Sequence, residues 1–186
     1  MKEPAHLDPA NCALLVVDIQ ERLMPVISGG EEVTRNSALL LKAARVMKMP
    51  VAATTQYAAR IGELLPAIKA ELGEVVPFDK MQFDCFADQV IRARVKELGQ
   101  GVNTLIICGV ETHICIYQSV LGALRVGYKV WVPADAVSSR SPRNYETGLA
   151  RIRELGGTVG STEMIIYDLL HRAGTPQFKE LLPYLK

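Results

Sequence analysis

Three chemically distinct side chains stand where short apolar runs end: a carboxylate, an ammonium and a thiol. Asp18 follows the run at residues 13–17, Lys80 follows the weaker run at residues 74–78, and Cys115 comes shortly after the run at residues 104–110. A thiol near neutral pH is mostly protonated and needs a base, and Asp18 can take that proton. An ammonium beside the carboxylate would keep it charged and oriented and would stabilise a thiolate. Together the three residues predict attack of a cysteine on a carbonyl group.

Each of these residues also has a purely structural interpretation. A carboxylate after a strand is most often a turn or cap residue, a lone lysine is usually a solvated surface charge, and a cysteine can be a small core hydrophobe. The core interpretation suits Cys108 better than Cys115, because Cys108 lies inside an unbroken apolar run. We expect Cys115 near the first turn of a helix, where the helix dipole lowers the pKa of a thiol. Neither interpretation is favoured for Cys12 or Cys85.

The elements that must position these residues alternate along the chain. Strands are expected at six runs of apolar and β-branched residues, namely 13–17, 51–55, 74–78, 104–110, 129–132 and 158–159. Pro77 favours an edge position for the third run. Amphipathic helices are expected around residues 40–47 and 117–124, and from the Ser141-Pro142 start signal to the Gly156-Gly157 stop. This alternation predicts an α/β fold of three layers, with a mainly parallel sheet of about six strands and helices on both faces.

The composition excludes several classes of protein. The chain has 186 residues, of which 49% are hydrophobic and 22% charged, so we expect one ordered domain over residues 1–186. Twenty-one Lys and Arg against 20 Asp and Glu give a net charge of +1, too balanced for a dedicated nucleic-acid-binding protein. No apolar run approaches the ~18 residues that span a bilayer, so no membrane partner is expected. The N-terminus has no apolar core typical of an export signal, and we expect a cytoplasmic protein with reduced cysteines.

Three motifs in series carry a resemblance to a known family. They are Leu-Val-Val-Asp-Ile-Gln at residues 15–20, Lys80 after a short strand, and Gly-Val-Glu-Thr-His-Ile-Cys at residues 109–115. In this order they resemble the isochorismatase-like cysteine hydrolases, in particular the short isochorismatase-domain proteins of mostly unassigned substrate. The resemblance runs from about Cys12 to about Leu170, and residues 134–141 and 161–164 are similar to the later part of the family.

The resemblance implies a Rossmann-like sheet and specific roles for the site residues. Asp18 would be the general base, Lys80 its electrostatic partner, and Cys115 the nucleophile that forms a covalent acyl intermediate. The family has a non-proline cis peptide that maps onto Val110-Glu111. The N–H groups of Glu111 and Cys115 would then form the oxyanion hole, where one donor is typically worth ~2.7–4 kcal/mol of barrier. A homo-oligomer is also expected by analogy with the family.

The sequence departs from the metal-dependent nicotinamidases of this family. Residues 54–60, where those enzymes carry metal ligands, contain neither histidine nor acid, and His6, His113 and His171 are scattered along the chain. We therefore expect no metal and no nicotinamidase activity. No glycine-rich dinucleotide fingerprint or P-loop follows the first expected strand, so no cofactor is expected either.

Several polar and aromatic residues near the motifs keep two interpretations. Gln20, Tyr57 and Phe86 either line a substrate pocket or pack in the core. Glu111 is either a polar core group or part of the pocket wall. His113 points to a different side of a helix from a residue two positions later, so a structural or interfacial role is favoured over a Cys–His pair.

The predicted function is hydrolysis of the C–N bond of a small amide-like substrate through Asp18, Lys80 and Cys115. One alternative is a hydrolase of an ether or ester bond on the same scaffold, in which Asp18 acts directly. Another is a non-catalytic interaction module, which would have no need for the three groups. The apolar tail at residues 178–184 could dock on a neighbouring subunit or on its own core.

Overall fold

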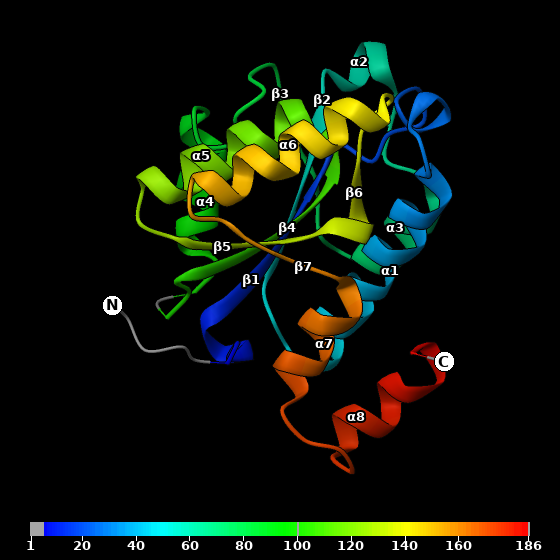
Figure 1. The fold of residues 1–186 in the computed structure, drawn as a ribbon, viewed down its shortest axis with the longest axis vertical. Helices are drawn as coiled ribbons and strands as arrows, with labels where there is room; N and C mark the ends of the chain where they lie inside the picture. Colours follow the sequence, from blue (N-terminus) through cyan, green and yellow to red (C-terminus); the bar gives the residue numbers. More distant parts are fainter. Residues whose placement is uncertain (1–5, 100, 186) are drawn as a thin grey trace.

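The chain is built around one mainly parallel sheet, as a computed structural model of residues 6–99 and 101–185 shows (Figure 1). The strand order is β3-β2-β1-β4-β5-β7, and β6 pairs with the end of β4. The strands are β1 (Cys12–Val17), β2 (Val51–Gln56), β3 (Phe78–Lys80), β4 (Thr104–Val110), β5 (Lys129–Pro133), β6 (Val137–Ser138) and β7 (Thr158–Gly160). The predicted α/β class with a mainly parallel sheet is confirmed.

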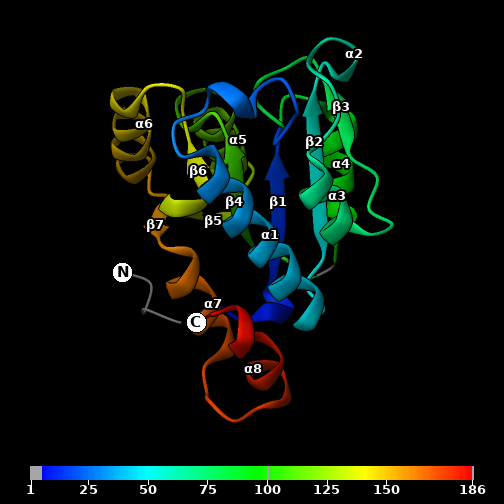
Figure 2. The ribbon, with the colours of Figure 1, turned by 90° about the vertical axis from the view of Figure 1, so that its right-hand side faces the viewer.

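Helices cover both faces of this sheet and complete the predicted three layers (Figure 2). One face carries α1 (Gly30–Val46), α3 (Pro66–Leu72) and α7 (Thr162–Leu170), with α8 (Pro176–Leu181) packed on α1. The other face carries α4 (Gln89–Glu97), α5 (Tyr117–Arg125) and α6 (Pro142–Glu154). Short elements complete the chain: α2 (Ala58–Ile61), a π-helical turn (Thr112–Ile116), and 3-10 turns at Pro9–Asn11, Met24–Val26, Ala134–Ala136 and Leu182–Tyr184.

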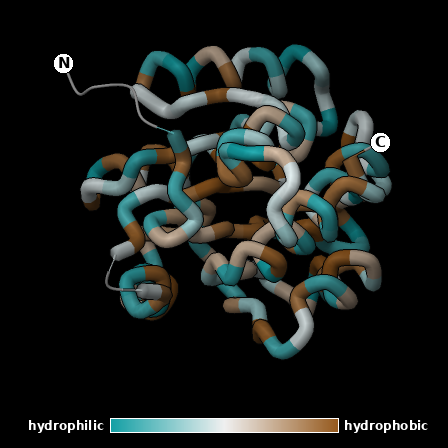
Figure 3. The backbone as a smooth tube through the Cα atoms, turned by 90° about the horizontal axis from the view of Figure 1, so that it is seen from below, coloured by the Kyte–Doolittle hydropathy of each residue, from teal (hydrophilic) through white to brown (hydrophobic). Residues whose placement is uncertain are grey.

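The burial of the central strand β1 explains why its residues form a continuous apolar run in the sequence. All six of its residues are buried, and alternate side chains enter the two cores on opposite faces of the sheet. Leu14 and Val16 pack under α1, whereas Leu15 and Val17 pack under α5 and α6. Hydrophobic segments accordingly run through the middle of the molecule, while the outer helices alternate between hydrophobic and hydrophilic residues (Figure 3).

The third strand lies later in the sequence than expected. The prediction placed it at residues 74–78, but β3 begins at Phe78 and ends at Lys80. Pro77 has no N–H to donate to a neighbouring strand, and pairing with β2 starts only after it, at Phe78 opposite Thr54. The edge position of this strand is confirmed. The two-residue strand β6 was missed because it is too short to show a pattern.

The C-terminal tail docks on its own chain rather than projecting toward a neighbour. Leu181 is completely buried in the same core as α1, and Phe178 packs against that core. The ammonium of Lys42 on α1 lies 4.1 Å from the centre of the Tyr184 ring. Within the described residues no helix has both the length and the apolar character needed to cross a membrane. Residues 1–5, on which the expectation about export depended, lie outside the described residues.

Candidate active site

The carboxyl ends of neighbouring strands bring Asp18, Lys80 and Cys115 to one edge of the sheet. Asp18 directly follows β1, and its φ of 55° lies in the left-handed region, where the chain turns sharply out of the strand. Lys80 is the last residue of β3. Cys115 lies in the π-helical turn that leads directly into α5, near the first turn of the helix as expected.

A glycine makes the close approach of β1 and β4 possible beside this site. Gly109 pairs with Val17 and has a φ of 119°, which favours glycine. A β-carbon at this position would lie 1.9 Å from the carbonyl oxygen of Val17. Any side chain here would therefore push apart the strand ends that carry Asp18 and the turn of Cys115.

Asp18 and Lys80 form an ion pair that is closed off from solvent. The Lys80 Nζ donates to Asp18 Oδ2 at 2.6 Å, and both side chains are 0% exposed. Burial by itself would lower the pKa of Lys80, but the negative charge of Asp18 and this hydrogen bond outweigh it. The pKa of Lys80 consequently lies above its ordinary value, and the ammonium remains charged.

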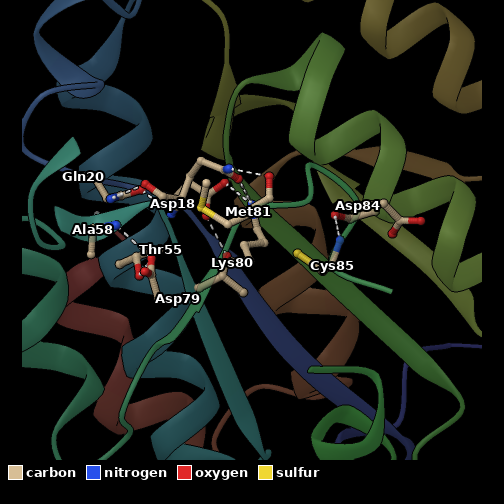
Figure 4. A network of polar contacts seen from close by, with 12 residues as sticks. Asp18, Gln20, Thr55, Ala58, Asp79, Lys80, Met81, Asp84 and Cys85 are labelled. Carbon is tan, nitrogen blue, oxygen red and sulfur yellow. Dashed lines mark hydrogen bonds and ion pairs between the residues drawn. The ribbon is translucent and has the colours of Figure 1, made fainter. Parts of the chain in front are cut away.

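Strand β2 supplies two further polar contacts to this ion pair, whose two members are labelled in Figure 4. The Thr54 hydroxyl donates to Asp18 Oδ1 at 2.8 Å, and Gln56 Oε1 accepts from Lys80 Nζ at 2.8 Å. The Gln56 Nε2 donates to the carbonyl oxygen of Met81 at 2.9 Å, which fixes the amide with its oxygen toward the lysine. Sequence reasoning missed both residues. The available signal was the run of three polar residues, Thr54, Thr55 and Gln56, that ends this strand, of which the first and third share a face.

The Cys115 thiol is held in its protonated form, contrary to the expectation of a lowered pKa. Burial, which leaves Cys115 only 7% exposed, raises the pKa of its thiol most strongly. The negative charge of Asp18 acts in the same direction, and the positive charge of Lys80 only partly offsets it. Cys115 therefore needs a base at the moment of attack, and Asp18 is the carboxylate whose charge acts on its thiol.

The other three cysteines are even less exposed than Cys115, and of these three only Cys85 is affected by the charges of Asp18 and Lys80. Burial raises the pKa of Cys12 and of Cys85 to about 11 and that of Cys108 to about 12. All three are at most 1% exposed. Cys108 lies inside β4, which agrees with its expected place in the core.

Glu111 forms the corner between β4 and the turn that carries Cys115. The peptide bond between Val110 and Glu111 is cis, at the position to which the family resemblance assigned it. The Glu111 side chain is directed to the neighbouring loop, where Oε2 accepts from the backbone N–H of Arg140 at 2.9 Å. Its carbonyl accepts from the N–H groups of Ile114 and Ile116, on either side of Cys115. Glu111 is thus a polar anchor of the turn rather than a free charge in a pocket.

His113 anchors the same turn from its other side. Its Nδ1 lies 2.9 Å from the Ser139 hydroxyl, and its Nε2 lies 3.3 Å from the Asn144 side-chain amide. One ring nitrogen is therefore engaged with the loop before α6, at Ser139, and the other with the first turn of α6, at Asn144. This arrangement favours the structural interpretation of His113 over a role as base for Cys115.

The three residues considered for pocket lining lie in different environments. Gln20 is fully buried, and its amide binds the backbone N–H and carbonyl of Gln56 and the carbonyl of Gly62. Phe86 is buried in the core against Tyr128. These contacts give Gln20 and Phe86 structural roles in place of pocket lining. Tyr57 is 40% exposed, and its N–H donates to the carbonyl oxygen of Lys80, so it remains a candidate for the rim of the site.

The histidines outside the site join the two ends of the described chain. His6 contacts Asp168 and stacks edge-on against His171, whose ring binds the carbonyl oxygen of Leu7. Across residues 6–99 and 101–185, no three His, Cys, Asp or Glu side chains are grouped so that they could hold a metal ion.

Comparison with known proteins assigns the chain to a family. The model of the isochorismatase domain matches residues 12–164, which include Asp18, Lys80 and Cys115. The chain belongs to the isochorismatase family. It is therefore an isochorismatase-family hydrolase, as the motif resemblance predicted.

Individual relatives agree with this assignment. The secreted isochorismatase effector Isc1 of Phytophthora sojae is 35% identical over 188 residues, which cover 100% of this chain and 89% of the relative. The MAR1 ribonuclease from Caenorhabditis elegans is similar in structure, with a TM-score of 0.90, 31% identity, and coverage of 97% of this chain and 92% of that one. The YcaC gene product of Escherichia coli, described as an octameric hydrolase of unknown specificity, has a TM-score of 0.89 at 22% identity, with coverage of 99% and 95%. The last likeness concerns the fold alone.

Proposed function

We propose that this isochorismatase-family hydrolase cleaves the C–N bond of a small amide-like substrate through a covalent acyl intermediate on Cys115. The observation that carries the proposal is the position of one carboxylate. Asp18 binds the Lys80 ammonium at 2.6 Å with both side chains closed off from solvent, and its negative charge acts on the buried Cys115 thiol. A base with a fixed cationic partner next to a protonated thiol is the arrangement that cysteine acyl transfer needs.

The proposed reaction begins when Cys115 Sγ attacks the substrate carbonyl carbon while its proton passes to Asp18. The carbonyl oxygen becomes an oxyanion, which the N–H groups of Glu111 and Cys115 would stabilise. The C–N bond then breaks, and Asp18 gives the proton to the departing nitrogen. Lys80 stays protonated throughout and offsets the negative charge that moves between the carboxylate, the sulfur and the oxygen.

The second half of the reaction releases the acyl group. Water attacks the thioester carbon, Asp18 takes a proton from this water, and the C–S bond breaks as the proton returns to Cys115 Sγ. The products are a carboxylic acid and an amine or ammonia, and the enzyme regains its starting protonation state. No cofactor takes part in the proposed steps.

The broader features of the protein belong to the same proposal. We infer a single cytoplasmic domain over residues 1–186 that assembles as a homo-oligomer. The homo-oligomer is proposed because the structurally similar YcaC gene product is described as octameric. The name of the structurally similar MAR1 ribonuclease implies an RNA substrate for that protein. A formal charge of +1 leaves this chain no excess of basic residues for binding RNA, so we favour a small molecule as its substrate.

The test is hydrolysis of a panel of small amides, with matched esters, vinyl ethers and an RNA oligonucleotide, in the full-length protein. For an amide that is turned over, Cys115→Ala is expected to reduce kcat on the order of 10⁴-fold or more. Cys12→Ala is the matched control, because Cys12 begins the strand at whose far end Asp18 lies. Near-full activity of Cys115→Ala on an ether or ester would support the alternative in which Asp18 acts directly. No turnover, with a Cys115 no more reactive than the other thiols, would support an interaction module.

A further inference from the structure

The C-terminal half of β2 presents its polar side chains to two different sites. Thr54 and Gln56 are two residues apart in the strand and face the Asp18–Lys80 pair. Thr55, between them, points to the opposite side, where its hydroxyl donates to Asp79 Oδ1 at 2.9 Å. Two adjacent threonines of one strand therefore make equivalent hydrogen bonds to two different carboxylates, only one of which belongs to the proposed triad.

Thr54 binds Asp18 through both its backbone and its side chain. The Asp18 N–H donates to the Thr54 carbonyl at 3.2 Å, and the Thr54 hydroxyl donates to Asp18 Oδ1 at 2.8 Å. Thr54 is completely buried, so no water competes for either contact. Since Lys80 occupies Asp18 Oδ2, each carboxylate oxygen has one protein donor of fixed direction.

A donor to a buried carboxylate does two things at once. It restricts rotation of the carboxylate, and it favours the ionised form over the protonated one. Both effects matter for a base that must be ionised and correctly directed before it accepts a proton. We propose that Thr54 is a positioning residue of the triad, whose hydroxyl fixes the Asp18 carboxylate and keeps it ionised until it takes the proton of Cys115. The part concerning the thiol proton rests on the proposed function, whereas the effect on Asp18 does not.

The surroundings of Asp18 make this effect measurable. The titratable groups that face it are Lys80 from β3, Cys115 from the π-helical turn and Cys85 from the loop after β3. Burial raises the pKa of the Cys85 and Cys115 thiols, whereas burial alone would lower the pKa of Lys80 and the negative charge of Asp18 raises it. A measurement that follows the Asp18 carboxyl carbon alone separates its response from that of these three groups.

The experiment is a carbon-13 NMR titration of the Asp18 carboxyl carbon in the full-length protein, with the resonance assigned by Asp18→Asn. Thr54→Val removes the hydroxyl at nearly constant volume, and the titration midpoint of Asp18 is expected to rise by about one to two pH units, the equivalent of a hydrogen bond to a charged group. Thr54→Ser keeps the hydroxyl and should restore the midpoint. Thr55→Val removes an equivalent hydroxyl from the same strand and should leave it unchanged.

Equal midpoints for Asp18 in Thr54→Val and Thr55→Val would overturn the proposal. Thr54→Ala provides the same comparison if valine is not accommodated. The readout does not depend on turnover, so full activity of Cys115→Ala would refute the cysteine mechanism and leave the Thr54 result standing. Conversely, an unmoved midpoint would refute the role of Thr54 without touching the role of Cys115.

Discussion

Replacing Asp18 by Asn is expected to move turnover and thiol acidity in opposite directions. The asparagine side chain keeps the shape of the carboxylate but cannot accept a proton. Turnover should fall by about 10²–10⁴-fold, the typical contribution of a general acid–base group. The Cys115 thiol should nevertheless become more acidic, because the nearby negative charge that adds to the effect of burial on its pKa is gone.

The size of the second effect follows from the position of the charge. Two unit charges about 4 Å apart interact by about 4 kcal/mol at an effective dielectric constant of about 20. Because about 1.4 kcal/mol corresponds to a factor of ten, loss of the Asp18 charge should increase the thiolate fraction of Cys115 by roughly a thousandfold.

The assay is alkylation by iodoacetamide at pH 7, with mass spectrometry of peptides to assign the modified cysteine. Cys115 in Asp18→Asn should react about one to two orders of magnitude faster than in the wild type, because the larger thiolate fraction is partly offset by the lower nucleophilicity of the more acidic thiol. Asp79→Asn is the matched control, since Asp79 binds Thr55 on the other side of the same strand. Cys115 reacting more slowly in Asp18→Asn would refute the argument that Asp18 keeps the thiol protonated at rest.

Three further predictions concern stability. Lys80→Met leaves a buried carboxylate without its cation and should lower the free energy of unfolding by about 3–5 kcal/mol, measured by urea denaturation; a change below about 1 kcal/mol would contradict the burial of the pair. The thiol of Cys108 has a pKa raised to about 12, so it binds a proton in the native state that the unfolded chain loses above about pH 8.5. Stability should therefore fall as pH rises through this range, by up to about 1.4 kcal/mol per pH unit for this group, and Cys108→Ala should reduce the slope of urea midpoint against pH. Gly109→Ala should lower the free energy of unfolding by more than about 4 kcal/mol in the same urea measurement, because the added methyl group would lie 1.9 Å from a carbonyl oxygen of β1. The control is Gly127→Ala, where φ is 96° and no atom lies within 4 Å of the added methyl group. This substitution should lower the free energy of unfolding by only about 1 kcal/mol.

Much of the fold could be predicted because the buried strands can be identified from the sequence alone. In β1 and β4 every residue is buried, so burial on both faces of the sheet leaves continuous apolar runs in the sequence. The limits of β3 could not be predicted in the same way. Val75 and Val76 look like strand residues, but Pro77 prevents regular pairing, and the strand is formed by Phe78–Lys80 instead.

The candidate site was predictable in its chemical groups and less so in its electrostatics. Strand ends identified Asp18 and Lys80 as neighbours, because parallel strands place their carboxyl ends at one edge. The sequence could not show that Cys115 lies in a π-helical turn, buried and against Asp18, where its pKa rises instead of falling. Nor could it show that Thr54 turns toward Asp18, since which face of β2 meets the site depends on strand order and register.

The central claim is that Cys115 is the nucleophile, and its most direct test is to trap the acyl intermediate. The full-length protein would be mixed with an activated acyl ester such as p-nitrophenyl acetate, quenched in acid within its first turnovers, and mapped by mass spectrometry. We expect the acyl group on Cys115 and its loss with time in the wild type, whereas the buried Cys12, Cys85 and Cys108 stay unmodified. Release of nitrophenol without acylation of Cys115, or equal acylation of all four cysteines, would contradict the account.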